Sequence, residues 1–452
     1  MKIALILPSI GKIPGQKYIR AWQMEPLSIA QLAALTPKDI EVIFFDDRME
    51  AVDYDVEVDL VAISIETYTA YRAYQIASEF RKRNRTIVMG GFHATLCPDE
   101  VAGYADAVVI GQAEGSWKML LKDFENGSLK KFYKIENIPE DELNILPDRS
   151  IYGNRNYVNI RLLEAGRGCK FRCEFCSIQQ FFEGKHFKKN IEMIVKDAAE
   201  LRKDKTLLFF VDDNIVSDVA FAKELFQALI PLKIKWVGQA DITIARDPQL
   251  LKLMAESGCQ GVLIGFESLN PDNLRLMNKT FNAVDGGPEK AVKIIHQHGL
   301  RLYATFLYGY KNDSQEDFER ILNFCINNRI FMVGFNHLTP FPGTRLYDRL
   351  KNENLLLYEK WWLSEDYRYG QIPFKTSIDH RFIEEQSKLA RKKFYSFRSI
   401  FYRMTNLTNI SNPAMFLYYF SINLLLKNDA GKRMKFPLGD RSKKYSLLKS
   451  TT

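Results

Sequence analysis

The sequence has few cysteines and no long hydrophobic run. Only 6 of its 452 residues are cysteine, which is too few for a secreted fold held together by disulfides. No run approaches the ~18 apolar residues of a membrane-spanning helix, and the N-terminus lacks the charged and apolar regions of a signal peptide. Internal repeats and low-complexity tracts are also absent. These absences predict a globular cytoplasmic protein, in which clustered cysteines bind metal rather than form disulfides.

Acidic residues are scarce in one region only. The net charge is +8, but residues 381–452 contain 15 Lys/Arg and 4 Asp/Glu and so carry +11, which leaves the rest nearly neutral. A basic region suits an anionic surface such as lipid headgroups, although a solvated tail that aids solubility has the same composition. The body is not basic and contains no recognisable RNA-binding module, which argues against nucleic acid as a partner.

Residues 1–135 alternate apolar strand patterns with helix patterns. This alternation predicts an α/β domain with a Rossmann-like, doubly wound parallel sheet. In such sheets ligands bind at the carboxyl ends of the strands. Small and polar residues gather at those positions: Ser64, Glu66, Thr67, Gly90, Gly91, His93, Thr95, Gly111 and Glu114.

Three further regions follow this domain. Residues 136–156 are polar, contain two prolines and read as a linker. Residues 157–375 contain about six more strand–helix units, which predicts a partial (β/α)6 barrel. Residues 376–452 read as a helical, basic region rich in aromatic side chains. These helices either cover the open side of the barrel or touch a membrane surface.

Three cysteines, Cys169, Cys173 and Cys176, lie within eight residues of the stretch "EAGRGCKFRCEFCSIQQ". A zinc site usually needs four ligands, and no second C-x2-C pair exists in the chain. Three thiolates at this C-x3-C-x2-C spacing suit an iron–sulfur cluster, with one iron left open for another ligand. The other cysteines are isolated and are expected to be core residues: Cys97, Cys259 and Cys325.

The pattern C-x3-C-x-aromatic-C after the first barrel strand resembles the radical S-adenosylmethionine (SAM) superfamily. The resemblance covers residues 157–366. It implies that the three cysteines hold a 4Fe–4S cluster, that SAM binds the open iron, and that reductive cleavage of SAM gives a 5′-deoxyadenosyl radical. It also implies an electron donor such as a flavodoxin or ferredoxin. By position it assigns SAM contacts to Phe175, Asp212, Asp213, Asn214, Gln239, Asp241 and Glu267, although any one of the carboxylates could equally cap a helix.

The first domain resembles the cobalamin-binding domains that are fused to radical SAM barrels. The resemblance covers about residues 1–130 and includes "GGFHATLCPDE" and "ADAVVIGQAEGSW". It implies that the small and polar residues at the strand ends contact cobalamin. The D-x-H-x-x-G loop of other cobalamin domains is missing, because the candidate region reads "DDRMEAVDYD". The resemblance therefore implies cobalt without a protein His ligand. His93 follows a different strand and could equally bond the backbone.

Together these features predict a cobalamin-dependent radical SAM enzyme that methylates an unactivated carbon. The two domains must then stack with the edge of the sheet facing the mouth of the barrel. Cyclisation, oxidation or carbon–carbon coupling with the same cofactors is the main alternative, and a non-catalytic regulator is disfavoured by the intact cysteine triad. Aromatic residues near the C-terminus could line an apolar pocket or could equally belong to the core. With the basic tail they favour a small hydrophobic, natural-product-like or lipid-like substrate for a cytoplasmic enzyme, either with or without membrane association. No catalytic acid or base is identified; Tyr308 and Tyr310 are candidates by position only.

Overall fold

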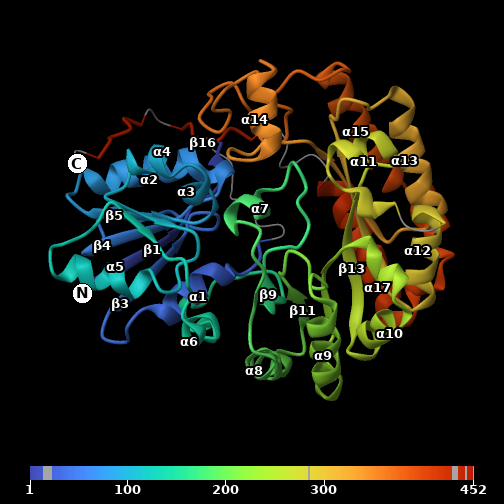
Figure 1. The fold of residues 1–452 in the computed structure, drawn as a ribbon, viewed down its shortest axis with the longest axis horizontal. Helices are drawn as coiled ribbons and strands as arrows, with labels where there is room; N and C mark the ends of the chain where they lie inside the picture. Colours follow the sequence, from blue (N-terminus) through green and yellow to red (C-terminus); the bar gives the residue numbers. More distant parts are fainter. Residues whose placement is uncertain (14–22, 284–285, 430–435, 443–444, 451–452) are drawn as a thin grey trace.

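The computed structural model describes all residues except 14–22, 284–285, 430–435, 443–444 and 451–452. Parts of the predicted C-terminal region therefore lie outside the described residues. Two parallel sheets lie next to each other along the longest axis of the molecule (Figure 1). The first is built by the N-terminal part of the chain and the second by its middle part.

The first sheet has six parallel strands in the order β3-β1-β4-β5-β6-β7. The strands are β1 (Lys2–Leu7), β3 (Glu41–Asp46), β4 (Leu60–Ser64), β5 (Thr86–Gly90), β6 (Ala107–Ile110) and β7 (Phe132–Lys134). One face packs on α2 (Ala70–Arg81), and the other packs on α1 (Leu27–Leu35) and α5 (Trp117–Glu125). The strand order reverses between β1 and β4, which is the switch point where doubly wound sheets bind ligands. The predicted Rossmann-like fold is confirmed.

The second sheet has six parallel strands in chain order. They are β8 (Ile160–Leu163), β11 (Leu207–Phe210), β12 (Trp236–Ala240), β13 (Cys259–Glu267), β14 (Arg301–Tyr308) and β15 (Met332–His337). No pairing within the described residues joins β8 to β15, so the sheet is open along one side. Its outer face is covered by α8 (Ile191–Leu201), α9 (Val219–Leu229), α10 (Pro248–Glu256), α12 (Gly287–Gln297) and α13 (Gln315–Asn327).

Local sequence explains why these helices begin where they do. Asn190, Asp218 and Asp247 each accept a hydrogen bond from a backbone N–H in the first turn of α8, α9 and α10, respectively. Such caps satisfy donors that have no partner inside the helix. Pro248 occupies the first position of α10, where its missing N–H costs nothing.

The segment between the two sheets is more ordered than the prediction of a linker suggests. It contains α6 (Glu140–Leu143) and a short 3-10 helix, η2 (Arg149–Tyr152). Arg149 binds Asp197 of α8, with Nη1 2.6 Å from Oδ1, and donates to the Leu162 carbonyl at 2.7 Å. Contacts between distant parts of the chain, which leave no local periodicity, therefore fix this segment.

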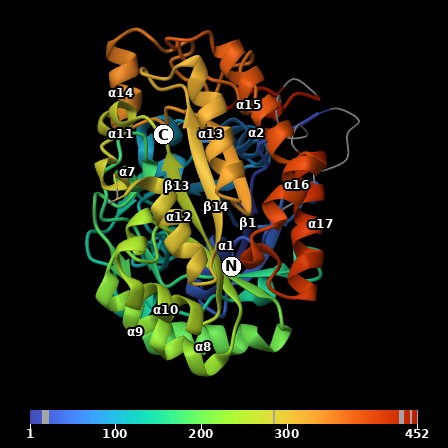
Figure 2. The same cartoon turned by 90° about the vertical axis from the view of Figure 1, so that its right-hand side faces the viewer.

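The C-terminal helices α15 (His380–Phe394), α16 (Phe397–Met404) and α17 (Pro413–Asp429) lie along the open side of the second sheet (Figure 2). The chain then returns to the first domain, where β16 (Gly439–Asp440) pairs with β2 (Gly11–Lys12). The region predicted as helical from 376 onward is thus not helical throughout, because this short strand pairing holds its end. Among the described residues, no helix combines the length and apolarity needed to cross a bilayer. Cys259 and Cys325 are buried, as expected, whereas Cys97 is half-buried.

Candidate active site

The carboxyl ends of the strands in the two sheets face each other. Phe92, which follows β5 and begins α3 (Phe92–Leu96), stacks on Phe181 at the end of α7 (Ser177–Phe181), with ring centroids 4.3 Å apart. Tyr68, which follows β4, lies with its hydroxyl 3.1 Å from the Thr339 hydroxyl beyond β15. Figure 1 shows α3 and α7 between the two sheets. Groups bound at either edge would therefore be close to each other. We call the carboxyl ends of the second sheet's strands the mouth.

The three clustered cysteines lie at the mouth, in the loop between β9 (Gly166–Arg167) and α7. All three are free thiols and are half-buried. Burial is the main cause that raises the pKa of Cys173 to about 11 and of Cys176 to about 12, and the neighbouring cysteines add to both shifts. Gly168, directly before Cys169, has φ +85°, and a Cβ there would clash with the Lys185 carbonyl. The turn into the cysteine loop therefore requires glycine.

The donor set of the cysteine loop suits a cluster rather than a single metal ion. In the described part of the chain, no three His, Cys, Asp or Glu side chains converge as a single ion requires. A cubane cluster takes each thiolate on a different iron, so its three ligands stand farther apart than the ligands of one ion. Three free, adjacent cysteines with no fourth thiol beside them fit a 4Fe–4S cluster better than a mononuclear metal.

Two acidic residues after β11 hold the backbone that precedes the cysteine loop. Asp212 accepts a hydrogen bond from the Ala165 N–H at 3.0 Å, and Asp213 accepts one from the Gly168 N–H at 2.8 Å. Burial raises the pKa of Asp212 to about 7 and that of Asp213 to about 6. Their observed contacts brace this loop, and their direct contact with SAM stays a prediction.

Asn214 connects the cysteine loop to the end of β12. Its Nδ2 donates to Asp241 Oδ2 at 2.9 Å and lies 3.9 Å from Cys169 Sγ. Gln239 on β12 donates to the Asp212 carbonyl at 3.3 Å. The structure therefore brings together Asp212, Asn214, Gln239 and Asp241, as their assignment to one site requires.

Glu267, at the end of β13, is paired with a lysine that the sequence reasoning missed. Lys279 Nζ lies 2.9 Å from Glu267 Oε1, and both side chains are buried. The same ammonium lies 6.0 Å from the ring centroid of Phe175, within the cysteine motif. Its charge opposes the rise in the pKa of Cys173 that burial causes. No motif surrounds Lys279, so only the fold reveals that it supports the cysteine loop.

A second charged group links the two domains at the mouth. Arg167, two residues before Cys169, binds Glu164 through Nε at 2.9 Å, and through Nη1 it binds Glu114 and Gln112 of the first domain, each at 2.7 Å. Burial disfavours a charged Glu164, but Arg167 and Lys189 outweigh it and lower the pKa of Glu164 to about 2. Glu114, assigned by resemblance to cobalamin, is therefore engaged by the barrel. Glu164 and Arg167 lie just before the cysteine motif in the sequence, and this nearness is the sequence signal that could have identified them as site residues.

The edge of the first sheet forms a glycine-lined surface. Gly91 has φ +106°, and a Cβ there would lie 2.7 Å from the Ile65 carbonyl oxygen. Thr95 donates to the Gly91 carbonyl and accepts from the Gly111 N–H, both at 2.9 Å. A Cβ on Gly111 would project into open space. The open space beside Gly111 fits a large planar group such as cobalamin lying against the edge. Ser64 pairs in register with Gly90 at the same edge.

His93 lies beneath this surface rather than on it. Its side chain is fully buried, with Nε2 3.1 Å from Glu100 Oε1 and Nδ1 3.4 Å from the Thr67 hydroxyl. Both ring nitrogens therefore have partners, which is compatible with the expectation that cobalt has no His ligand from the protein. Glu66 is exposed at the same edge and forms a capping box with Thr69.

The two tyrosines suggested by position lie in the hydrophobic core of the second domain. Tyr308 and Tyr310 are almost fully buried, and burial raises the pKa of each above its usual value. Both hydroxyls are buried without a hydrogen-bond partner among the described residues, and Tyr310 lies near enough to Cys173 and Glu267 for their charges to raise its pKa further. A catalytic role for either tyrosine stays a prediction.

Comparison with known proteins gives the same picture. The family model of the Radical SAM superfamily matches residues 163–325. Bacteriochlorophyllide d C-12(1)-methyltransferase of Chlorobaculum tepidum is 30% identical over 380 residues, which cover 82% of each chain. The radical SAM methyltransferase TsrM of Kitasatospora setae, solved with cobalamin and a [4Fe-4S] cluster, shares the fold with a TM-score of 0.61 and 17% identity over 78% of each chain. The cobalamin-dependent radical enzyme OxsB, with a TM-score of 0.66 and 13% identity, matches 94% of this chain and 71% of its own. The chain is a member of the radical SAM superfamily and groups with its methyltransferases.

Proposed function

We propose that the protein is a cobalamin-dependent radical SAM enzyme that methylates an unactivated carbon of a hydrophobic small molecule. The observation that carries this proposal is the position of the cysteine loop, opposite the glycine-lined edge of the Rossmann-like sheet. When bound, the 4Fe–4S cluster and SAM supply radical chemistry, and cobalamin supplies the methyl group. A flavodoxin or ferredoxin is the electron donor expected for such an enzyme.

The residues of the chain supply position and charge. Cys169, Cys173 and Cys176 would hold the cluster, and Gly168 with Asp213 fixes the turn before them. Lys279 brings positive charge beside the thiolates, which favours their ionised form. The Arg167–Glu114 pair ties the edge that would bind cobalamin to the loop that would bind the cluster.

Relatives support methyl transfer to carbon. The Chlorobaculum tepidum relative is named for methylation of bacteriochlorophyllide d at C-12(1). Its 30% identity extends over 82% of this chain and so includes most of both domains. The same reaction class on a hydrophobic acceptor is the function that this similarity and the site support best.

The decisive experiment uses protein reconstituted anaerobically with iron and sulfide. It is supplied with cobalamin, a reductant and SAM carrying an isotopically labelled methyl group, and candidate acceptors are analysed by mass spectrometry. The proposal expects retained cobalamin in the absorption spectrum, 5′-deoxyadenosine formation and labelled product. Deoxyadenosine without labelled product from any acceptor would favour cyclisation, oxidation or coupling, and loss of cobalamin on purification would contradict the assignment of the first domain.

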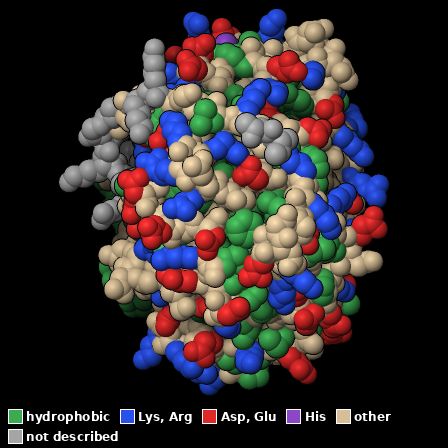
Figure 3. All heavy atoms as spheres, turned by 90° about the vertical axis from the view of Figure 1, so that its left-hand side faces the viewer, with side chains coloured by type: hydrophobic (Ala, Val, Ile, Leu, Met, Phe, Trp, Pro, Cys, Tyr) green, Lys and Arg blue, Asp and Glu red, His purple; other side chains and the backbone are tan. Residues whose placement is uncertain are grey.

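We also infer that α16 and α17 contact an anionic membrane surface peripherally. Residues 386–428 contain no Asp or Glu, and their exposed basic side chains are Lys388, Lys392 and Lys393 at the end of α15, Arg398 on α16 and Lys427 on α17. Large apolar side chains are exposed on these helices and the loop between them: Leu407 is 75% exposed, Leu417 65% and Leu425 56%. In Figure 2 both helices lie at the outer surface. By contrast, the first domain shows intermixed acidic and basic side chains on the face seen in Figure 3. An apolar, purely basic surface matches the chemistry of anionic headgroups over acyl chains.

Sedimentation with lipid vesicles tests this contact. The protein should sediment with vesicles containing phosphatidylglycerol, less with phosphatidylcholine alone, and less at high salt. Leu407→Ser with Leu417→Ser should reduce binding at least several-fold. Leu276→Ser is the matched control, because Leu276 is an exposed leucine on α11 (Pro271–Leu276). Equal binding by the two variants, or binding that ignores lipid charge, would contradict the contact.

A further inference from the structure

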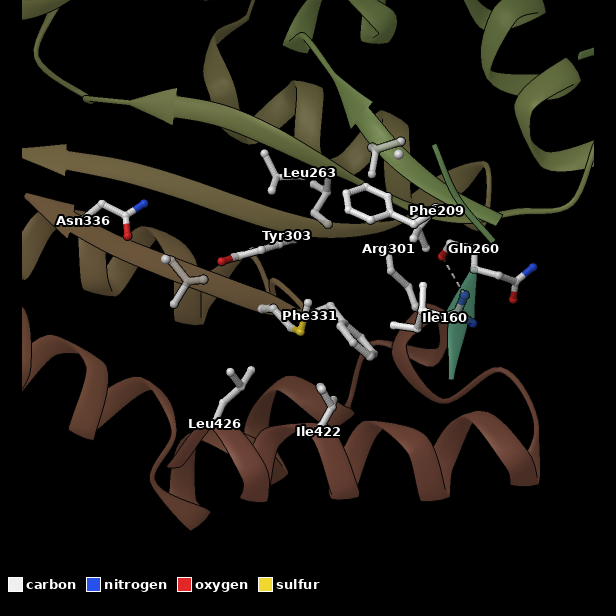
Figure 4. A pocket seen from close by; sticks show the side chains of 18 of the residues that line it. Ile160, Phe209, Gln260, Leu263, Arg301, Tyr303, Phe331, Asn336, Ile422 and Leu426 are labelled. Atoms are coloured by element: carbon white, nitrogen blue, oxygen red, sulfur yellow. Dashed lines mark hydrogen bonds between the residues drawn. The ribbon is translucent and has the colours of Figure 1, made fainter. Parts of the chain in front are cut away.

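A large cavity lies between the concave face of the second sheet and α17, and Tyr68 of the first domain also lines it (Figure 4). Its volume is about 820 Å³, within the range of small-molecule sites. Residues from all six strands line it, so the open sheet curves around this space. Phe209, Leu263 and Tyr303 contribute from the strands, and Ile422 and Leu426 point into it from α17. No residue assigned to the cluster or to SAM lines it.

The charges that line this cavity have one sign. Lys235, Arg301 and Arg391 are the charged residues among its described lining, which contains no Asp or Glu. Lys235 precedes β12 and Arg301 begins β14, so both lie at the amino ends of the strands, far from the mouth. We call this end of the cavity its floor.

Arg301 is buried, and no carboxylate among the described residues pairs with it. The residue is only 7% exposed. Its Nη1 donates to the Gln260 carbonyl at 2.8 Å, and its Nη2 donates to the Ser411 hydroxyl at 2.6 Å. Its Nε has no hydrogen-bond partner in the described structure. Burial of an unpaired charge is costly, so proteins normally pair a buried arginine with a carboxylate. An anion brought by a ligand would provide the missing partner.

Arg403 is a second buried arginine in this region, and the fold itself satisfies its donors. A buried arginine with an unpaired donor is therefore not required to hold these helices together. Its guanidinium donates to the carbonyls of Ile330, Phe331 and Phe394, to Asn423 Oδ1 and to the Ser399 hydroxyl. All its nitrogens therefore have acceptors within the fold. Arg301 differs in that its Nε has no partner among the described residues, on a side chain that lines the end of an apolar cavity.

The cavity runs along the strands from Arg301 toward the mouth. In Figure 4, Arg301 lies at one end with Gln260 and Ile160, and Asn336 lies at the other. On β15 the lining extends from Met332 to His337, five residues or roughly 17 Å at ~3.3 Å per residue, and it includes Thr339 beyond the strand. An elongated ligand anchored at Arg301 would therefore extend toward the cysteine loop.

We propose that this cavity binds an amphiphilic acid, with a carboxylate or phosphate at Arg301 and Lys235 and an apolar body along the inner face of the sheet, its far end turned toward the mouth. The role of this ligand as methyl acceptor rests on the proposed function; its binding does not. The distance between floor and mouth would then determine which carbon of the ligand is presented for reaction.

Equilibrium binding to the reconstituted full-length protein tests this proposal without turnover. The probe is cis-parinaric acid, a fluorescent long-chain carboxylate, displaced in separate titrations by palmitate, geranylgeranyl phosphate, protoporphyrin IX and hexadecanol. The acids should compete, and hexadecanol, which lacks the charge, should bind at least ten-fold more weakly. The ranking of fatty acid, isoprenoid phosphate and tetrapyrrole acid identifies the source of the anion. Equal competition by the alcohol and the acids would overturn the proposal.

Variants separate the charge from the apolar body. Arg301→Gln should weaken binding of the acids at least ten-fold and leave the weak binding of hexadecanol unchanged. Arg398→Gln, which removes an exposed arginine of α16, is the matched control and should bind as wild type. Leu263→Trp should weaken binding of acid and alcohol alike by filling the space, and thermal unfolding verifies that each variant is folded. Unchanged affinity of the acids in Arg301→Gln would contradict the proposal.

The two proposals fail separately. A protein that methylates an acceptor but does not bind the fluorescent acid retains the proposed function and excludes this inference. A protein that binds the acid through Arg301 but never cleaves SAM shows the reverse.

Discussion

The mouth and the floor of the second domain treat charge in opposite ways. At the mouth, buried charges are paired with each other: Arg167 binds Glu164 and Glu114, and Lys279 binds Glu267. At the floor, Arg301 is buried beside apolar side chains and has no carboxylate partner in the part of the chain that the structure describes. The folded chain thus completes the electrostatics of the mouth by itself. The floor lacks a counter-charge for Arg301 among the described residues. This difference separates a preorganised cofactor site from a site that needs the charge of its ligand.

The largest expected effect concerns the cysteines at the mouth. Cys173→Ala removes one of the three thiolates of the cluster and should abolish SAM cleavage, measured as 5′-deoxyadenosine formed after anaerobic reconstitution. The iron content and the cluster absorption should fall together with activity. Cys97→Ala is the control, because Cys97 lies in the first domain and outside the cysteine loop, and it should retain both. SAM cleavage by Cys173→Ala would show that the cluster is held elsewhere.

The next effect tests whether the charges at the mouth depend on one another. Arg167→Met leaves Glu164 and Glu114 without their guanidinium and should destabilise the protein by about 3–5 kcal/mol, the usual result of breaking a buried ion pair. Urea unfolding monitored by circular dichroism measures this. Arg83→Met breaks the exposed pair with Asp55 and should cost about 1 kcal/mol or less. Similar losses in the two variants would mean that the Arg167 cluster is not a buried, coupled unit.

The sequence revealed the mouth better than the floor for physical reasons. Cys169, Cys173 and Cys176 are close in sequence and occupy a loop after a strand, so their spacing alone indicates shared chemistry. Asp212, Asn214 and Asp241 follow apolar strands, whose parallel alignment brings their ends together. Lys279 and Arg301 have no such signal, because each meets its surroundings only through tertiary packing. The order of the segment predicted as a linker was missed for the same reason, since Arg149 is fixed by Asp197, 48 residues away.

Two buried arginines provide a third test of the difference between complete and incomplete sites. Arg403→Met leaves several buried carbonyls without donors and should destabilise the protein by about 3 kcal/mol. Arg301→Met releases the Gln260 carbonyl and the hydroxyl of Ser411, which is exposed to water, and it removes an unpaired charge. Its stability should stay within about 1 kcal/mol of wild type. A large loss in Arg301→Met, measured by the same urea titration, would show that Arg301 holds the fold rather than a ligand.

The smallest effect lies at the boundary of the mouth, where Asp212 forms no ion pair with any described residue. Burial raises the pKa of Asp212 from 3.8 to about 7, so between these pH values the folded state binds a proton that the unfolded state releases. Stability due to this group is therefore present at low pH and is lost as pH rises toward 7.

Asp212→Asn keeps an acceptor for the Ala165 N–H but cannot ionise. Relative to wild type, it should gain about 2 kcal/mol of stability between pH 5 and pH 8. Asp213 shifts in the same direction and remains in both proteins, whereas Glu164, with a pKa of about 2, stays ionised throughout this range. Asp204→Asn, at a more exposed carboxylate paired with Arg161, should show no such gain. If the stability difference between Asp212→Asn and wild type did not change with pH, Asp212 would already be ionised at pH 5, and its charge would have to be balanced as fully as the other charges of the mouth.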